Sequence, residues 1–169
     1  GVQNTIVGGR AGDALTDADY NVAIGEQALT TDTKGNRSVA VGFGALAIQN
    51  FTTSTDTYNV GVGSNAGEQL TTGIHNVFIG GLAGDFLTDA DDNVAIGYTA
   101  LSADRLGSRN VALGRGTLSN QAFTTATESY NTAAGYHAGH QITTGRFNSL
   151  VGGLAGDAFT TGEHNVAVG

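Results

Sequence analysis

The chain has no cysteine, proline, methionine or tryptophan, and only 13% of its 169 residues are charged. The lack of cysteine excludes disulfides, thiolate metal sites and a cysteine nucleophile. No apolar run approaches the roughly 20 residues of a membrane-spanning helix, and no secretory signal opens the chain. A net charge of −8 argues against phosphate backbones and anionic lipid, so we expect no nucleic-acid partner and no membrane insertion.

Glycine is what the chain has in excess, with 27 residues, and most of the glycines belong to a repeat. The motif N-x-x-x-G recurs with successive spacings of 17, 17, 21 and 17, and the same four spacings then follow again. Each set of four spacings defines a super-repeat, so the chain contains super-repeats at 4–75 and 76–147 and a partial one at 148–169. Repeats of this length stack on their neighbours, so the sequence predicts a single repetitive domain over residues 1–169.

Two columns of the motif predict specific backbone features. The first column predicts a ladder of stacked side-chain amides. It consists of Asn4, Asn21, Asn59, Asn76, Asn93, Asn110, Asn131, Asn148 and Asn165, with Ser38 in the remaining copy. The fifth column predicts a tight bend that excludes a Cβ. It consists of Gly8, Gly25, Gly42, Gly63, Gly80, Gly97, Gly114, Gly135, Gly152 and Gly169.

The residues between and after these columns predict strands. The second and fourth motif residues are mostly Val, Ile or Leu, and this alternation of β-branched side chains indicates a short strand. Alanine stands seven residues after the Asn in eight of nine copies, which predicts a second, closely packed strand. We therefore expect an all-β chain, a parallel β-solenoid or β-roll of about ten 17- or 21-residue coils. Each coil would contain a strand, a bend, a second strand and a polar turn, with Val, Ile and Leu filling its interior.

One apolar side chain per coil changes its place in the sequence. Where Leu follows the alanine, as at Leu29, the residue three positions further on is polar, in this case Asp32. Where Gly follows it, as at Gly84, that later residue is apolar, in this case Leu87. Because a core keeps a constant volume from layer to layer, both positions are expected to serve one interior site.

The middle residue of the first strand predicts an oligomer. It is small in most copies and bulky in Ile6, Phe78 and Leu150, which are one super-repeat apart. A strand without a polar face is usually buried on both sides. We therefore expect this column, with Ile6, Phe78 and Leu150, to form the face between the chains of a homotrimer around a long axis. A monomeric solenoid is the alternative.

The sequence pattern NVAIGxxAL, followed by TTG and N, resembles the repeats of phage and prophage tail-fibre proteins. It is similar, more loosely, to the S-V-A-I-G repeats in the head domains of trimeric autotransporter adhesins, whose units are shorter than those found here. The resemblance implies a left-handed parallel β-roll, with three chains intertwined or side by side. It also implies a non-enzymatic attachment fibre of a virion, with a bacterial surface adhesin as the alternative.

The column before the asparagine is the candidate binding surface. It contains Tyr20, Tyr58, Tyr130 and Phe147, and also Arg37 and Arg109. Aromatic side chains with polar edges suit carbohydrate, so these aromatic residues form a candidate glycan-contact surface. The alternative is that they cover a groove between neighbouring chains. Expected partners are therefore further copies of the chain and a cell-surface glycan or protein receptor.

We expect no catalytic, cofactor or metal site. The aspartate-rich turns return only once in each super-repeat, which indicates solvated turns rather than calcium sites. His75 and His164 share the variable column before the asparagine, and His137 and His140 have no nearby carboxylate in the sequence. Ser, His and Asp recur in no common arrangement, so a glycan-degrading fibre enzyme is a weaker alternative. Ice binding is weaker still, because the two residues of each Thr pair would point to opposite faces of a strand.

Overall fold

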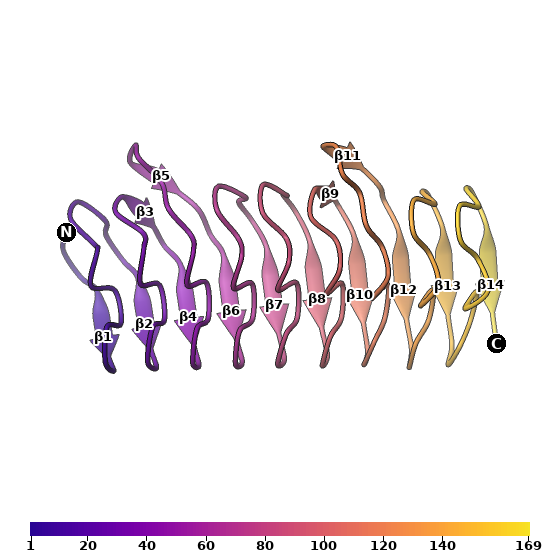
Figure 1. Ribbon diagram of the computed structural model, residues 1–169, viewed down its shortest axis with the longest axis horizontal. Helices are drawn as coiled ribbons and strands as arrows, with labels where there is room; N and C mark the ends of the chain where they lie inside the picture. Colours follow the sequence, from indigo (N-terminus) through magenta and orange to yellow (C-terminus); the bar gives the residue numbers. More distant parts are fainter.

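The computed structural model describes all residues 1–169 and contains no helix. It is a stack of ten coils, each of which adds one strand to a single parallel sheet along the long axis (Figure 1). The all-β parallel solenoid predicted from the repeat is therefore confirmed. In sheet order the strands are β1 (Thr5–Val7), β2 (Val22–Ile24), β4 (Val39–Val41), β6 (Val60–Val62), β7 (Val77–Ile79), β8 (Val94–Ile96), β10 (Val111–Leu113), β12 (Thr132–Ala134), β13 (Ser149–Val151) and β14 (Val166–Val168).

The register places equivalent motif positions beside one another, also across a 21-residue coil, where Val39 pairs with Val60. The four extra residues of such a coil are therefore accommodated outside the main sheet. A short arm stands at each 21-residue coil, where a strand of this coil pairs with a strand of the coil before it. In the first arm β3 (Gly35–Asn36) pairs with β5 (Thr55–Asp56), and in the second β9 (Gly107–Ser108) pairs with β11 (Thr127–Glu128). Both arms stand at the upper edge of the stack in Figure 1.

The prediction of a second strand at the alanine column is wrong, because this segment is a turn. Leu82 and Gly84, on either side of the buried Ala83, have φ values of 58° and 59°. This left-handed backbone interrupts the extended geometry that a strand requires. The coils still bond to one another here, since the Gly84 N–H donates to the Ala100 carbonyl at 2.9 Å.

The middle strand residue points into the coil, which corrects the assignment of the inter-chain face. Phe78 and Leu150 are completely buried within the single chain, and Ile6 is 44% exposed in the first coil of the stack. Ile6 pairs with the buried Ala23, and so lies on the inner side of the sheet as well. The prediction that Ile6, Phe78 and Leu150 lie between chains is therefore wrong. Val94 and Ile96 and their equivalents lie outside instead of filling the coils. A 17-residue circuit encloses a thin interior, which a close-packed alanine on the strand suits better than valine.

The first nine coils each receive one large apolar side chain from the two exchanging columns, as predicted. Leu15 and Phe159, in the first and ninth coils, are partly buried. The side chains between them are completely buried and consist of Leu29, Leu46, Leu70, Leu87, Leu101, Leu118 and Ile142. Phe78 is an additional large side chain, and glycines make room for it. A Cβ at Gly67 would lie 2.5 Å from the Phe78 ring, and one at Gly84 would lie 2.6 Å from it.

The asparagine ladder and the bend glycines are both present. The Asn93 N–H donates to Asn76 Oδ1 at 3.0 Å, and the Asn93 side-chain amide donates to the Gly107 carbonyl at 3.0 Å. The ladder is interrupted after Ser38, where the Asn59 N–H instead donates to Thr57 Oγ1 at 3.3 Å. The bend glycines from Gly8 to Gly152 have φ between 124° and 138°, a region that residues with a Cβ rarely adopt.

Candidate functional site

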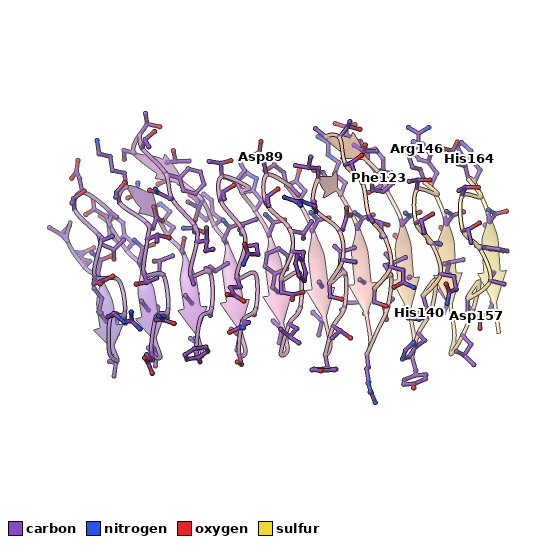
Figure 2. The ribbon with its side chains drawn as sticks, in the orientation of Figure 1. Asp89, Phe123, His140, Arg146, Asp157 and His164 are labelled. Carbon is purple, nitrogen blue, oxygen red and sulfur yellow. The ribbon has the colours of Figure 1, made fainter.

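The column before the asparagine forms a continuous row of side chains, here called the edge row. Each member immediately precedes one copy of the motif, and all have φ between 49° and 63°. The aromatic members are exposed, from 38% at Phe147 to 51% at Tyr58, as the variability of the column predicts. Figure 2 shows His164, the last member, at the upper edge of the stack. The edge row consists of Gln3, Tyr20, Arg37, Tyr58, His75, Asp92, Arg109, Tyr130, Phe147 and His164.

Side chains of the edge row stack mainly on one another. The ring centroids of Tyr130 and Phe147 are 5.5 Å apart, those of Phe147 and His164 are 4.8 Å apart, and both pairs are nearly parallel. The Arg37 guanidinium lies over the Tyr20 ring at 4.9 Å. These contacts occupy ring faces that a sugar would need for stacking. The glycan-contact role of Tyr20, Tyr58, Tyr130 and Phe147 stays a prediction, and ring edges rather than stacked faces would make the contacts.

Arginines of the edge row hold the two arms. Arg109 forms an ion pair with Glu128 on β11, and its Nη1 donates to the Tyr130 hydroxyl at 2.6 Å. The Tyr130 hydroxyl in turn donates to Glu128 Oε2 at 3.1 Å. In the first arm, Arg37 Nε lies 3.1 Å from the Asp56 carboxylate. Since all these groups are exposed, the pairs contribute little stability, and their effect is to fix the position of the arms.

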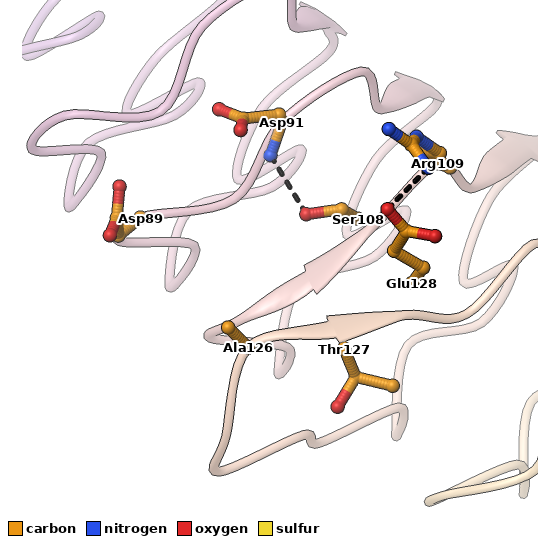
Figure 3. Close-up of a pocket in the computed structure, with 7 residues that line it drawn as sticks. All are labelled: Asp89, Asp91, Ser108, Arg109, Ala126, Thr127 and Glu128. Atoms are coloured by element: carbon orange, nitrogen blue, oxygen red, sulfur yellow. Dashed lines mark hydrogen bonds and ion pairs between the residues drawn. The ribbon is translucent and has the colours of Figure 1, made fainter.

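A recess of about 390 Å³ lies beside the second arm and is here called the arm recess (Figure 3). Strands β9 and β11 and the residues next to them supply five of its lining residues. The turn before β8 supplies the other two. The Asp91 N–H donates to Ser108 Oγ at 3.0 Å, which fixes the turn against the arm. The complete lining is Asp89, Asp91, Ser108, Arg109, Ala126, Thr127 and Glu128.

The first arm carries a nearly identical set of residues but has no recess. The reason is Asn36, which is buried at the position that Ser108 occupies in the next super-repeat. Its amide nitrogen lies 3.1 Å from Ser54 Oγ and 3.3 Å from Asp56 Oδ1, and donates to both. The longer side chain therefore closes the space that serine leaves open. The equivalent residues are Asp17, Asp19, Asn36, Arg37, Ser54, Thr55 and Asp56.

A buried polar network supports the base of each arm, and the sequence did not reveal it. In the second arm Asp104 Oδ1 accepts the N–H groups of Gly107 and Phe123, and Asp104 Oδ2 accepts the Gln121 amide at 2.5 Å. Burial raises the pKa of Asp104, and these hydrogen bonds oppose the increase. Asp32 and Gln49 form the same pair in the first arm, at 2.6 Å. The available signal was the pairing of Asp with a Gln one coil later, found only at the two 21-residue coils.

The opposite edge of the stack carries the remaining histidines. Ser119 Oγ and His140 Nδ1 lie 2.7 Å apart, a contact between adjacent coils that the sequence did not suggest. Asp157 occupies the column of His140 in the next coil and lies at the same edge in Figure 2, but no hydrogen bond or ion pair joins it to the imidazole. Burial, with a smaller effect of His140, lowers the pKa of His137. Ser119 and His140 therefore lack the carboxylate that orients histidine in an acid–base site.

Asp85 is the buried carboxylate with the clearest consequence for pH. It is 8% exposed, its Oδ1 has no hydrogen-bond partner, and burial with a smaller effect of Glu68 raises its pKa to about 6. Because the pKa is higher in the folded state, protonation of Asp85 stabilises the fold. This stabilisation is complete below the unfolded pKa near 4 and is lost above about pH 6. Asp85→Asn should therefore increase the free energy of unfolding by about 1–2 kcal/mol at pH 8.

The increase in the free energy of unfolding that Asp85→Asn gives at pH 8 should disappear below about pH 4. Urea unfolding of both proteins at pH 4 and pH 8 measures the two differences. Asp157→Asn, at the exposed position of the same column, is the control for removing one surface charge. An Asp85→Asn variant that is less stable than the parent at pH 8 would contradict the assignment.

No group of three or more His, Asp and Glu side chains is arranged to hold a metal ion. A helix that could cross a membrane is likewise not found. No protein-family model, curated protein or solved structure matches the chain. The fold is that of a parallel β-solenoid.

Proposed function

We propose that the chain is a structural, non-enzymatic fibre protein, and that three copies form a rigid shaft or head for attachment to a host or surface. A phage tail fibre, located on the virion, is the favoured form. A bacterial trimeric adhesin on the cell surface is the alternative. The resemblance of the repeat supports this proposal and, within it, a left-handed coil.

The observation that carries the proposal is the outer face of the sheet, formed by the first and third residue of each of the ten main strands. Its twenty positions hold only Val, Ile, Leu, Ala, Thr and Ser, without one charged side chain. Many of the apolar side chains are exposed, among them Ile24, Ile79, Ile96 and Leu113. Ten strands of three residues cover about 48 Å by about 10 Å, or on the order of 500 Å². This is at the upper end of what a monomer leaves exposed.

A further copy of the same chain is the partner that this face fits best. It offers an equally long uncharged strip with the same spacing of about 4.8 Å between strands. The edge row, with its arginine and carboxylate side chains, flanks the strip at the start of the strands. An apolar centre with a polar rim is the usual composition of a protein–protein interface. Closed rotational symmetry, here threefold, lets every copy bury the same strip.

The native mass of the purified chain tests the proposal, measured by light scattering. We expect about three chains per particle, and a shift to monomers for Ile96→Glu, because a charge at the centre of an apolar contact cannot be solvated. Ala103→Glu, at an exposed bend away from the outer face, should keep the mass of the parent. Circular dichroism shows whether both variants keep the fold. A parent chain that is monomeric at all concentrations would overturn the trimer.

A further inference from the structure

We propose that the arm recess is a binding site for a neutral or amino-group-bearing saccharide. The inference deepens the proposed attachment function, on which it rests, by naming the chemical class of the receptor. Its starting point is the arm recess itself, a space of about 390 Å³ whose lining includes the polar side chains of Asp89, Asp91, Ser108 and Arg109 (Figure 3). Such a volume is within the range of sites for small ligands.

The lining keeps acceptors and donors free for a ligand. Asp89 uses one carboxylate oxygen to accept the Thr72 hydroxyl at 2.7 Å, and Asp91 uses one to accept the Ile74 N–H at 2.8 Å. The second oxygen of each carboxylate has no partner within the chain. On the other side, Ser108 accepts the Asp91 N–H and retains its own hydroxyl proton. Arg109 is bonded through Nε and Nη1, which leaves the Nη2 protons available.

This distribution matches a polyhydroxylated ligand. A sugar hydroxyl can donate to a carboxylate oxygen and accept from a guanidinium or a hydroxyl at the same time. Hydrogen bonds to the charged groups Asp89, Asp91 and Arg109 are stronger than bonds between neutral groups. Two neighbouring hydroxyls on one ring could therefore bridge the acidic and the basic side of the recess.

The same lining disfavours the other ligand classes. Three carboxylates face a single guanidinium, so phosphate, sulfate and acidic sugars meet a net negative site. Ala126 is the one apolar side chain in the lining, which gives an apolar ligand almost no surface to bury. An amino group on the sugar would instead be attracted by the carboxylates.

The first arm provides an internal comparison, because it has the same charges and no recess. Asn36 and Ser54 close the space there, whereas Ser108 and Ala126 leave it open. Exchanging these two residues should therefore close one site or open the other without changing net charge. The double variant Ser108→Asn with Ala126→Ser closes the arm recess. The double variant Asn36→Ser with Ser54→Ala opens the equivalent space in the first arm.

The experiment applies the chain and both variants to a printed array of defined neutral, N-acetylated, amino and acidic oligosaccharides. The strongest binder then serves as the probe in isothermal titration calorimetry. We expect binding to neutral or amino members, a loss of affinity of about tenfold or more in the closed variant, and one additional site per chain in the opened variant. Binding of no array member, binding to acidic members alone, or equal binding by the closed variant would overturn the inference.

The outcome is separable from that of the fibre proposal. Neither exchange alters the outer face, so both variants should have the native mass of the parent. A trimer that binds no saccharide overturns only the saccharide site. A monomer that binds saccharide through the arm recess overturns only the trimer.

Discussion

Replacing Gly80 by alanine should destabilise the chain severely, whereas the same replacement at the next residue, Gly81, should have almost no effect. Gly80 has φ of 126°, and a Cβ there would lie 2.8 Å from the backbone carbonyl of Gly97 in the adjacent coil. Backbone strain of about 1–3 kcal/mol adds to an overpacking cost of similar size. We expect a loss of about 3 kcal/mol or more, which lowers Tm by about 6–12 °C in a chain of this length.

Gly81 is the matched control because it lies in the same bend without these constraints. Its φ is not in the left-handed region, and the nearest atom to a new Cβ is a Tyr98 ring carbon at 3.5 Å, an ordinary contact. Alanine there reduces the entropy of the unfolded chain and should be neutral or stabilising by up to about 1 kcal/mol. Thermal unfolding of the two single variants decides the matter. Equal Tm values would show that the bend tolerates a side chain.

Phe78→Ala should cost about 3–5 kcal/mol in the free energy of unfolding, because it leaves a cavity in the thin interior. Gly61, Gly67 and Gly84 would border that cavity, and none of them has a side chain that could fill it. Phe78→Leu restores what Leu150 provides at the same position of the next super-repeat, so its cost should be only about 1 kcal/mol.

Ile79→Ala tests the other side of the same strand. Ile79 is exposed in the single chain, so in the trimer proposed above its loss should weaken association more than the stability of one chain. Urea unfolding together with native mass separates the two effects. If Phe78→Ala lowered the native mass of the proposed trimer while each chain stayed fully stable, the interior position of Phe78 would be wrong.

The sequence was sufficient to predict the coil and its stacking. A 17-residue repeat is too short to bury its apolar residues alone, so equivalent residues of successive repeats must lie above one another. The asparagine ladder followed directly as a prediction of stacked amides, and in the structure the Asn93 backbone N–H donates to Asn76 Oδ1. The side of the strand that faces inward did not follow. Alternation separates Val77 and Ile79 from Phe78, but it assigns neither set to the interior. The available signal that Phe78 is enclosed was the small residue next to it on the neighbouring strand, Gly61.

The candidate site was less accessible to sequence reasoning than the fold. The edge row could be predicted as exposed from the variety of its residues, but the stacking of Tyr130 on Phe147 depends on the distance between coils. The arm recess depends on small differences between two similar arms, Ser108 and Ala126 against Asn36 and Ser54. Asp104 is polar and stands in the column that exchanges with the large apolar residue, so the sequence did not indicate that it is buried. Its burial became visible only with the N–H groups of Gly107 and Phe123 around it.

The orientation of the hydrogen bonds determines how the molecule carries mechanical load. Bonds between coils, such as that from the Val94 N–H to the Asn110 carbonyl at 2.8 Å, join neighbours along the stacking direction. Tension along the long axis therefore acts on the coils in series, and they would separate one at a time. A detached 17-residue coil can extend to roughly 60 Å, whereas in the stack it occupies only about 4.8 Å. Each coil that detaches therefore lengthens the molecule before any covalent bond is stretched.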